Sequence, residues 1–451
     1  MNFDIVILAA GMGVRTKLPY SKLVAKINGK PMIYFPLKAA IMTNPSNIII
    51  VTNKNNDGVE KALEEIEYPI KFVKQQSLAG TADALKTALR LSKSDYLVVI
   101  NGDMPLLRAE IIKKLLSYAE TKNPDEAFIY TKPENPGTLG RVFFEKDDFK
   151  IVEASETSKS SNYVNAGLYL FKRGFLEKNI DILRPNNNKK ELYITDLFNL
   201  KANKTACFYE DWKSLCGVNS LDELEFAGCE LRSRKIASLL SNGVIIYDGS
   251  TLYIEEDAEV GRGTLIYPHA VIKGKSRIGE NCVVESFSTI SDSALRNNVT
   301  VKSGSYIEGS LVKENSVIGP MAHLRPGSII GKSCKVGNFV ETKKAVLEQG
   351  VKASHLSYLG DCQIGKNTNI GCGTITCNYD GFRKYKTEIG SNVFIGSDSQ
   401  LVAPVRIGNG SLIAAGSTVV KDVPDDAMAI SRAEQKNIEG AAKRFREKRQ
   451  R

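Results

Sequence analysis

The second half of the chain repeats an aliphatic residue every six positions. Isoleucine or valine recurs in unbroken six-residue steps from Ile254 to Ile290. The spacing slips, resumes from Val312 to Val336, and appears again from Ile389 to Val419. A single turn of such a repeat cannot bury its own aliphatic row, so successive turns must stack on one another. The sequence therefore predicts a parallel β-helix over residues 244–431.

One segment interrupts this repeat. Residues 376–388 read TCNYDGFRKYKTE, which is polar, aromatic and basic. Insertions in stacked-repeat proteins map to loops on one face, which is often the binding face. An inert surface loop fits the same letters equally well.

The first 220 residues follow a different pattern. Short apolar runs (FDIVILAAG, NIIIVTN and YLVVINGDMPL) alternate with helix-like segments such as 81–91 and 109–122. This alternation predicts an α/β domain with a parallel sheet and helices on both faces. Ligands of such sheets bind beyond the carboxyl ends of the strands, where AAGMG and NGDMP fall. Residues 221–243 have a helical pattern and are expected to connect the two halves.

The opening LAAGMGVRTKLPYSK indicates a phosphate-binding loop of a less common kind. Gly11 and Gly13 are followed by Val14 and by the cations Arg15 and Lys22. A dinucleotide fingerprint would need a third glycine, and a P-loop would need Gly-Lys-Ser/Thr, so neither fits.

Composition restricts the class of protein without deciding its function. The chain has 451 residues, 42% of them apolar and 25% charged, which indicates globular domains. No apolar run reaches membrane length, and no membrane partner is expected. The net charge of +10 is compatible with a nucleic-acid-binding protein, but it is also compatible with an enzyme of nucleotides and sugar phosphates.

The basic tail, 432–451, is expected to be a solvated terminus, and no nucleic-acid partner is expected. The eight cysteines form no C-x-x-C pair, which predicts free thiols in a reducing cytoplasm.

Motifs along nearly the whole chain resemble those of the bacterial bifunctional N-acetylglucosamine-1-phosphate uridylyltransferases/glucosamine-1-phosphate acetyltransferases. They are LAAGMGVR, LAGTADA, NGDMPL, GTLGRV, YVNAGLY, ELYITD and CGVNS in the first half, and HLRPG, GNFVETKKA, ASHLSYLGD, GCGTITCNYDG and IGSDSQLVAP in the second. The resemblance implies a Rossmann-like nucleotidyltransferase domain (1–220), a helical linker (221–243) and a left-handed β-helix acetyltransferase domain (244–431). It also implies a cytoplasmic homotrimer that uses Mg²⁺, UTP, acetyl-CoA, glucosamine-1-phosphate and N-acetylglucosamine-1-phosphate.

The resemblance assigns residues to the uridylyl site. It implies that Arg15 and Lys22 act on the phosphates and that Asp103 and Asn219 hold Mg²⁺, an oxygen ligand set suited to that ion. A structural turn aspartate is the alternative for Asp103. It implies UTP contacts at Leu8, Ala9, Ala10, Gly11, Gln75, Gly80 and Thr81, and sugar-phosphate contacts at Gly140, Glu153, Asn165 and Asn219.

The resemblance also assigns the acetyl site. It implies that His355 is the base that takes a proton from the attacking amine, with Glu341 as a candidate to orient it. It implies glucosamine-phosphate contacts at Arg325, Lys343, Tyr358 and Asn369, and acetyl-CoA contacts at Cys372, Asn378, Tyr379, Ser397, Ala415 and Arg432; Asn378 also matches a glucosamine-phosphate contact. The three histidines, at 269, 323 and 355, are too widely spaced to favour a zinc site. Cys372 is expected to be a small buried hydrophobe rather than a nucleophile.

Four positions depart from the family pattern. Val14 replaces a usual threonine, Ala79 a leucine, Asn101 a common tyrosine and Cys372 an alanine. Two rival interpretations remain at this point: a monofunctional nucleotidylyltransferase with a purely structural β-helix, and a non-enzymatic scaffold with a partner-binding tail. The HLSYLGD and TCNYDG motifs count against the first, because a scaffold does not require them. The second leaves Arg15, Lys22, Asp103 and Asn219 without a role.

Overall fold

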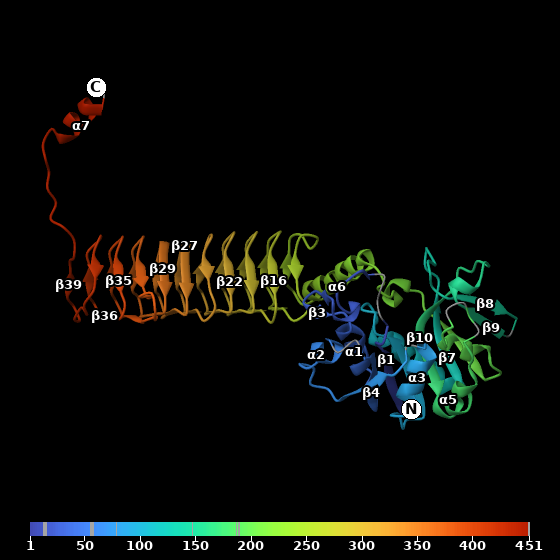
Figure 1. The fold of residues 1–451 in the computed structure, drawn as a ribbon. Coiled ribbons are helices and arrows are strands. Elements are labelled where there is room, and N and C mark those ends of the chain that lie inside the picture. Colours follow the sequence, from blue (N-terminus) through green and yellow to red (C-terminus); the bar gives the residue numbers. More distant parts are fainter. Residues whose placement is uncertain are drawn as a thin grey trace. The chain divides into compact units, whose positions relative to one another are not determined.

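The computed structural model describes residues 1–11, 16–54, 58–77, 79–146, 148–185, 187 and 190–449. The chain divides into two compact units, Met1–Ser233 and Arg234–Arg451 (Figure 1). Each unit has its own core, built from a different kind of sheet.

A seven-stranded path of sheet forms the centre of the first unit. Its order is β11 (Lys204–Phe208), β7 (Glu126–Thr131), β10 (Val164–Lys172), β6 (Tyr96–Asn101), β1 (Phe3–Leu8), β4 (Asn47–Asn53) and β5 (Ile70–Gln75). Strands β1, β4, β5 and β6 are parallel, as expected, but β10 runs antiparallel to both β6 and β7. The prediction of a wholly parallel sheet is therefore wrong at β10. An apolar run has the same letters in either direction, so hydrophobicity could not indicate this reversal.

Two short strand pairs accompany this sheet. Strands β8 (Arg141–Glu145) and β9 (Asp148–Val152) form a hairpin, and β8 also pairs with β10. Strands β2 (Lys26–Ile27) and β3 (Lys30–Pro31) form a separate ribbon.

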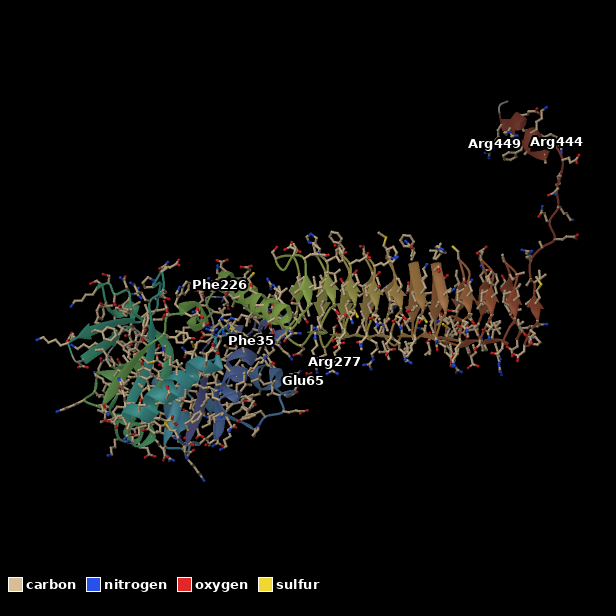
Figure 2. The ribbon with its side chains drawn as sticks, turned by 180° about the vertical axis from the view of Figure 1, so that it is seen from behind. Phe35, Glu65, Phe226, Arg277, Arg444 and Arg449 are labelled. Atoms are coloured by element: carbon tan, nitrogen blue, oxygen red, sulfur yellow. The ribbon has the colours of Figure 1, made fainter. Side chains whose placement is uncertain are left out.

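Helices cover both faces of the central sheet. Alternate residues of β1 belong to different cores: Ile5 and Ile7 to one face and Val6 to the other. The first face packs against α1, whose Phe35 is labelled in Figure 2, and α4; the second packs against α3 and α5. The α-helices are α1 (Tyr34–Ile41), α2 (Gly58–Ala62), α3 (Thr81–Leu89), α4 (Ala109–Lys122) and α5 (Arg173–Asn179), and the 3₁₀ segments are η2 (Lys22–Val24), η3 (Ala154–Glu156), η4 (Ile180–Ile182), η5 (Ile194–Asn199) and η6 (Trp212–Leu215). The expected helices at 81–91 and 109–122 correspond to α3 and α4.

Two buried carboxyl groups in this sheet differ in whether they are hydrogen-bonded. Asp4 of β1 accepts hydrogen bonds from Asn47 Nδ2 (2.9 Å), Ser92 Oγ (2.7 Å) and Ser94 Oγ (2.9 Å). Glu126 of β7 is also fully buried, but neither of its carboxyl oxygens has a hydrogen-bond partner among the described residues. Burial raises the pKa of Glu126 to about 8, although the charge of the neighbouring Lys204 opposes the shift.

This raised pKa makes the stability of the first unit depend on pH. Between about pH 4.5 and pH 8, an unfolded chain ionises Glu126 while the folded chain keeps it neutral, so stability falls as pH rises and the loss is complete above the folded pKa. We expect Glu126→Gln to raise the free energy of unfolding by about 4 kcal/mol at pH 9 and by little at pH 5. Urea titrations followed by the fluorescence of Trp212, the single tryptophan, check this.

A matched control is Glu64→Gln, which removes an exposed carboxylate from the same unit. The free energy of unfolding of this variant should differ little from that of the wild type at both pH 5 and pH 9. An equal effect of Glu126→Gln at pH 5 and pH 9 would contradict the buried, protonated state.

Helix α6 (Leu221–Ser241) occupies the segment expected to be helical, and the two compact units divide within it, after Ser233. The helix begins with a capping box. Glu223 N donates to Ser220 Oγ (3.2 Å), and Ser220 N donates to Glu223 Oε2 (3.0 Å). These two bonds satisfy amide groups that a helix start leaves without partners.

The second unit is a left-handed parallel β-helix, as expected (Figure 1). Its strands form two parallel sheets over the described residues 234–449. The larger sheet contains β12 (Ile245–Ile246), β13 (Tyr253–Ile254), β15 (Leu265–Ile266), β16 (Val271–Lys273), β18 (Val283–Val284), β19 (Thr289–Ser291), β21 (Thr300–Val301), β22 (Tyr306–Glu308), β24 (Val317–Ile318), β25 (His323–Leu324), β27 (Lys335–Lys343), β29 (Lys352–Gly360), β31 (Asn369–Ile370), β32 (Ile375–Cys377), β34 (Phe394–Ile395), β35 (Gln400–Val402), β37 (Leu412–Ile413), β38 (Thr418–Val419) and β39 (Met428–Ala429). The smaller sheet contains β14 (Glu259–Val260), β17 (Arg277–Ile278), β20 (Ala294–Leu295), β23 (Leu311–Val312), β26 (Ile329–Ile330), β28 (Val346–Leu347), β30 (Cys362–Ile364), β33 (Thr387–Ile389) and β36 (Val405–Ile407).

The six-residue repeat marks the inside of the coil. Every aliphatic residue of the three predicted series is buried except Val260, which is partly buried. Arg277, by contrast, points away from the coil, while the next residue, Ile278, is buried (Figure 2). The register slips after Ile290 because the next inward residue, Leu295, comes one position early. The hexapeptide prediction is confirmed.

The helix α7 (Ala441–Arg449) lies in the basic tail. None of its residues is buried, and Arg444 and Arg449 are labelled on it in Figure 2. No helix in the described ranges is long and apolar enough to span a membrane.

Candidate active sites

The carboxyl ends of β1, β4 and β5 bring together part of the predicted UTP site. Residues 8–11 end β1 and continue beyond it, and Gly102 N, from the loop after β6, donates to Leu8 O (2.9 Å). Asn53 at the end of β4 donates to Ala10 O, and Asn53 pairs in register with Gln75 of β5. The predicted residues Gly13, Val14 and Arg15 lie outside the described residues.

Gln75 also contacts the start of α3, where Gly80 and Thr81 lie. Its Nε2 donates to Gly80 O (3.2 Å) and to Asp83 Oδ2 (2.7 Å). Gly80 has φ +116°, and a Cβ there would lie 2.4 Å from Leu192 O. Only glycine allows this approach of two backbones. Three of the predicted UTP contacts therefore lie together in the fold.

The predicted metal ligands converge on the ammonium group of Lys22. Lys22 Nζ donates to Asp103 Oδ2 (2.6 Å), Val218 O (2.7 Å) and Asn219 Oδ1 (2.9 Å). Lys22 is only 8% exposed, so it is not the ordinary surface lysine that its charge alone would suggest. The structure thus joins three predicted residues that are far apart in the sequence.

Backbone contacts hold Asn219 beside Asp103. Val218 N donates to Asp103 O (2.9 Å), and Asn219 N donates to Glu223 Oε2 (2.5 Å) in the first turn of α6. A Cβ on Gly217 would lie 3.3 Å from Asp103 Oδ1, so the loop passes close to this carboxylate. The capped start of α6 therefore positions one side of the site.

The predicted sugar-phosphate residues form a second cluster in this unit. Asn165 N donates to Gly140 O (2.9 Å), and a Cβ on Gly140 would lie 3.6 Å from both carboxylate oxygens of Glu153. The antiparallel strand β10 carries Asn165 here and places Gly167 against Asn101, at the end of β6. Thr195 Oγ1 donates to Glu153 Oε1 (3.1 Å), a contact to which the sequence assigned no role, although Thr195 belongs to the ELYITD motif.

In the β-helix, the predicted glucosamine-phosphate residues include a cluster of cations. Arg325 donates to Glu341 Oε1 (2.7 Å), and Glu341 lies on β27 two residues before Lys343. The neighbouring ammonium group of Lys384, and after it the charge of Arg325, lowers the pKa of Lys343. Positive charges that lie close together repel each other, and an anion between them would relieve that repulsion. The site therefore suits a phosphate.

Tyr358 and Asn378 meet beside this cluster. A Cβ on Gly360 would lie 2.5 Å from the Tyr358 hydroxyl and 2.8 Å from Asn378 Nδ2, so glycine makes room for both groups. Asn378 Nδ2 donates to Asp361 Oδ2 (2.6 Å) and thereby ties the inserted segment to the coil. Asn369 lies on β31 in register with Lys352, and within the described residues no hydrogen bond links its side chain to the cluster.

The inserted segment 376–388 is an ordered hairpin. Asp380 Oδ1 accepts from Phe382 N (2.8 Å) and Arg383 N (2.6 Å), and Tyr385 N donates to Asn378 O (2.9 Å). The hairpin presents Lys384 to Lys343. The sequence reasoning missed Lys384, although it noted the basic character of this segment.

His355 and four predicted acetyl-CoA residues lie along one corner of the coil. His355, Cys372, Ser397 and Ala415 each come directly before a residue with positive φ, in successive turns of the β-helix: Leu356 (24°), Gly373 (78°), Asp398 (57°) and Gly416 (72°). Backbone bonds link the turns, from Asp398 N to Cys372 O (2.7 Å) and from Gly416 N to Ser397 O (2.8 Å), and Arg432 donates to Ala415 O (2.7 Å). Residues spread over more than seventy positions thus form one line. The Cys372 thiol is exposed at this corner, so the prediction that Cys372 is buried is wrong.

The structure differs from the expectation that Glu341 orients the His355 ring. The partner of Glu341 is Arg325, and His355 pairs in register with Asn338. In the described part of the chain, no side chain is hydrogen-bonded to the His355 ring. The same residues contain no cluster of three His, Cys, Asp or Glu side chains that could hold a metal ion.

Known proteins resemble the chain along its whole length. A family model described as nucleotidyl transferase matches residues 5–220, one described as GMPPB C-terminal domain matches 249–332, and one described as bacterial transferase hexapeptide (six repeats) matches 386–421. The "Bifunctional protein GlmU" of Thermodesulfovibrio yellowstonii is 42% identical over 98% of this chain and 99% of its own length. The GlmU of Clostridioides difficile is 39% identical over 98% of this chain and 97% of its own length.

The chain belongs to the GlmU family. It is a bifunctional enzyme, a glucosamine-1-phosphate acetyltransferase and an N-acetylglucosamine-1-phosphate uridylyltransferase, and it contributes to cell-wall precursor synthesis. The interpretation as a monofunctional enzyme with a structural β-helix is not favoured, because GlmU relatives match both halves.

Proposed function

We propose that the two GlmU reactions take place at the two clusters described above, in a cytoplasmic enzyme that uses Mg²⁺. The observation that carries this proposal is the convergence of Lys22, Asp103 and Asn219 in one unit and of Arg325, Lys343 and Lys384 in the other. The first cluster offers oxygen ligands for a hard cation, and the second offers cations for a sugar phosphate. The eight free cysteines are consistent with a reducing compartment.

In the acetyl site, Arg325, Lys343 and Lys384 hold the phosphate of glucosamine-1-phosphate. The sugar nitrogen attacks the thioester carbonyl of acetyl-CoA, the carbon–sulfur bond breaks, and His355 takes the proton that the amine loses. The corner residues Cys372, Ser397, Ala415 and Arg432, with Tyr379 of the hairpin, line the path of the coenzyme.

In the uridylyl site, the residues position two phosphates for an in-line displacement. A phosphate oxygen of N-acetylglucosamine-1-phosphate attacks the α-phosphorus of UTP, and the bond to the β-phosphate breaks to release pyrophosphate. Gly140, Glu153 and Asn165 hold the sugar, while Gln75, Gly80 and Thr81 read the uracil. Asp103 and Asn219 fit Mg²⁺, since their oxygens already converge on one cation, and the ion supplies positive charge to the phosphates. Lys22 neutralises the α-phosphate, and Arg15 the leaving pyrophosphate.

An assay on the purified protein tests this scheme. With acetyl-CoA and glucosamine-1-phosphate we expect thiol release, and after addition of UTP and Mg²⁺ we expect pyrophosphate and UDP-N-acetylglucosamine. Supplying N-acetylglucosamine-1-phosphate directly should bypass the first step. Pyrophosphate formation without any thiol release would instead support a β-helix that is only structural.

We also propose that the β-helix assembles as a homotrimer through one apolar corner. Phe287, Met321, Phe339 and Leu356 have positive φ (60°, 51°, 55° and 24°) and are 56–67% exposed. Bulky residues seldom adopt this strained conformation, and strain of this kind concentrates at functional surfaces. Exposed apolar residues in a row favour contact with another protein surface.

We expect the double substitution Met321→Ser and Phe339→Ser to dissociate the trimer and to abolish acetyl transfer while uridylyl transfer continues. Sedimentation velocity and the two assays measure this. Val420→Ser is the control, because Val420 is equally exposed (60%) on the same β-helix but outside the row. A trimer that survives the double substitution, or an active monomeric wild type, would contradict the proposed contact.

A further inference from the structure

Lys22 occupies the place where a divalent ion would bind to Asp103 and Asn219. Its ammonium nitrogen lies 2.6 Å from Asp103 Oδ2 and 2.9 Å from Asn219 Oδ1, and a third bond reaches Val218 O (2.7 Å). An ammonium group and a divalent ion both require oxygen atoms directed at one point. The same oxygens therefore serve either cation.

The Asp103 carboxylate has little room to bind the Lys22 ammonium group and a divalent ion at the same time. Asp103 Oδ2 bonds Lys22, while Oδ1 faces the backbone at Gly217. Two positive charges a few ångströms apart in a part-buried site repel strongly. Binding of the ion therefore requires that the ammonium group of Lys22 leave.

We propose that Lys22 is an internal cation that holds the metal ligands together and competes with the divalent ion for them. This inference rests on the proposed function, because that proposal assigns the ion to Asp103 and Asn219. The ion displaces the ammonium group, which then becomes available to the phosphates of the nucleotide. A nucleotide that attracts Lys22 strengthens binding of the ion, and the ion strengthens binding of the nucleotide by the same factor.

Binding of Mn²⁺ to the full-length protein without substrates tests the competition. Electron paramagnetic resonance of free Mn²⁺ gives the dissociation constant without any assay of activity. We expect Lys22→Met to bind Mn²⁺ roughly tenfold or more tightly than the wild type, because the competing charge is gone. Lys22→Gln, which keeps a hydrogen-bond donor but no charge, should also bind more tightly. Equal or weaker binding by both variants would overturn the proposal.

Two further variants distinguish a failure of the competition proposed for Lys22 from a failure of the proposed metal site. Lys26→Met removes an exposed lysine of the same segment and should bind Mn²⁺ as the wild type does. Adding Asp103→Ala to Lys22→Met should abolish the gain in Mn²⁺ affinity.

If the higher Mn²⁺ affinity survives without Asp103, the ion binds elsewhere and the proposed metal site fails. If Asp103→Ala removes Mn²⁺ binding but Lys22→Met does not strengthen it, the metal site stands and the competition is wrong. The fluorescence of Trp212, which lies in the same unit as Lys22 and Asp103, reports that each variant is folded.

Discussion

Replacing His355 by alanine is expected to reduce acetyl transfer by 10²- to 10⁴-fold, the usual contribution of a positioned base. The amine of glucosamine-1-phosphate must lose a proton as it attacks the thioester, and His355 is the histidine on the coil corner that carries the predicted acetyl-CoA residues. The loss should appear in kcat rather than in KM, since the base acts on the transition state. Uridylyl transfer from supplied N-acetylglucosamine-1-phosphate should be unchanged.

Thiol release as a function of pH completes this experiment. The wild-type rate should fall toward acid pH as an imidazole protonates, and the residual rate of the variant should lack this fall. Arg277→Ala is the control, because Arg277 is exposed on the same β-helix and belongs to neither the acetyl site nor the apolar corner. Normal turnover with poor binding of glucosamine-1-phosphate would make His355 a substrate contact and assign the base to another group.

Replacing Asp103 by alanine is expected to abolish UDP-N-acetylglucosamine formation at any practical Mg²⁺ concentration. Such electrostatic contributions are worth about 10²-fold or more. Asp103 also pairs with Lys22, so Asp103→Asn, which keeps a hydrogen-bond acceptor for Lys22 but not the charge, should lose nearly as much activity. Acetyl transfer should stay near normal, because its residues lie in the other unit.

The control for Asp103 lies beside the same strand, β6. Asp95→Ala removes an exposed aspartate next to the opposite end of β6 and should leave both reactions intact. Pyrophosphate release, measured over a range of Mg²⁺ concentrations, compares the variants. Activity of Asp103→Ala above about a tenth of wild type would remove this residue from the metal role.

The sequence predicted the β-helix well because burial in a coil repeats in a fixed period. Each inward aliphatic residue, from Ile254 to Val419, has the same environment one turn later, so the pattern is visible without a structure. The first unit was less predictable. Its parallel strands follow from apolar runs, but the reversal of β10 depends on pairing between distant segments. Local patterns carry no information about such pairing.

The site residues, like the fold, were only partly predictable from local sequence patterns. A carboxylate after a strand marked Asp103 as a candidate, but nothing local shows that Lys22 Nζ lies between Asp103 and Asn219. Lys384 was missed for a related reason, because its meeting with Lys343 depends on how the hairpin folds back onto the coil. Contacts across many residues come from tertiary structure, which motifs indicate only through resemblance.

The hairpin at 376–388 leaves the surrounding coil unchanged. Ile364 pairs with Ile389 across the insertion, just as Ile389 pairs with Ile407 in the next turn. The extra residues therefore leave the strand at one corner and rejoin the stack in register. The length and sequence of such an inserted segment can therefore change in evolution with little loss of stability in the stacked core. Substrate choice in this architecture can thus change separately from stability, and hairpins transplanted between β-helices of this kind provide a route to new acyl acceptors.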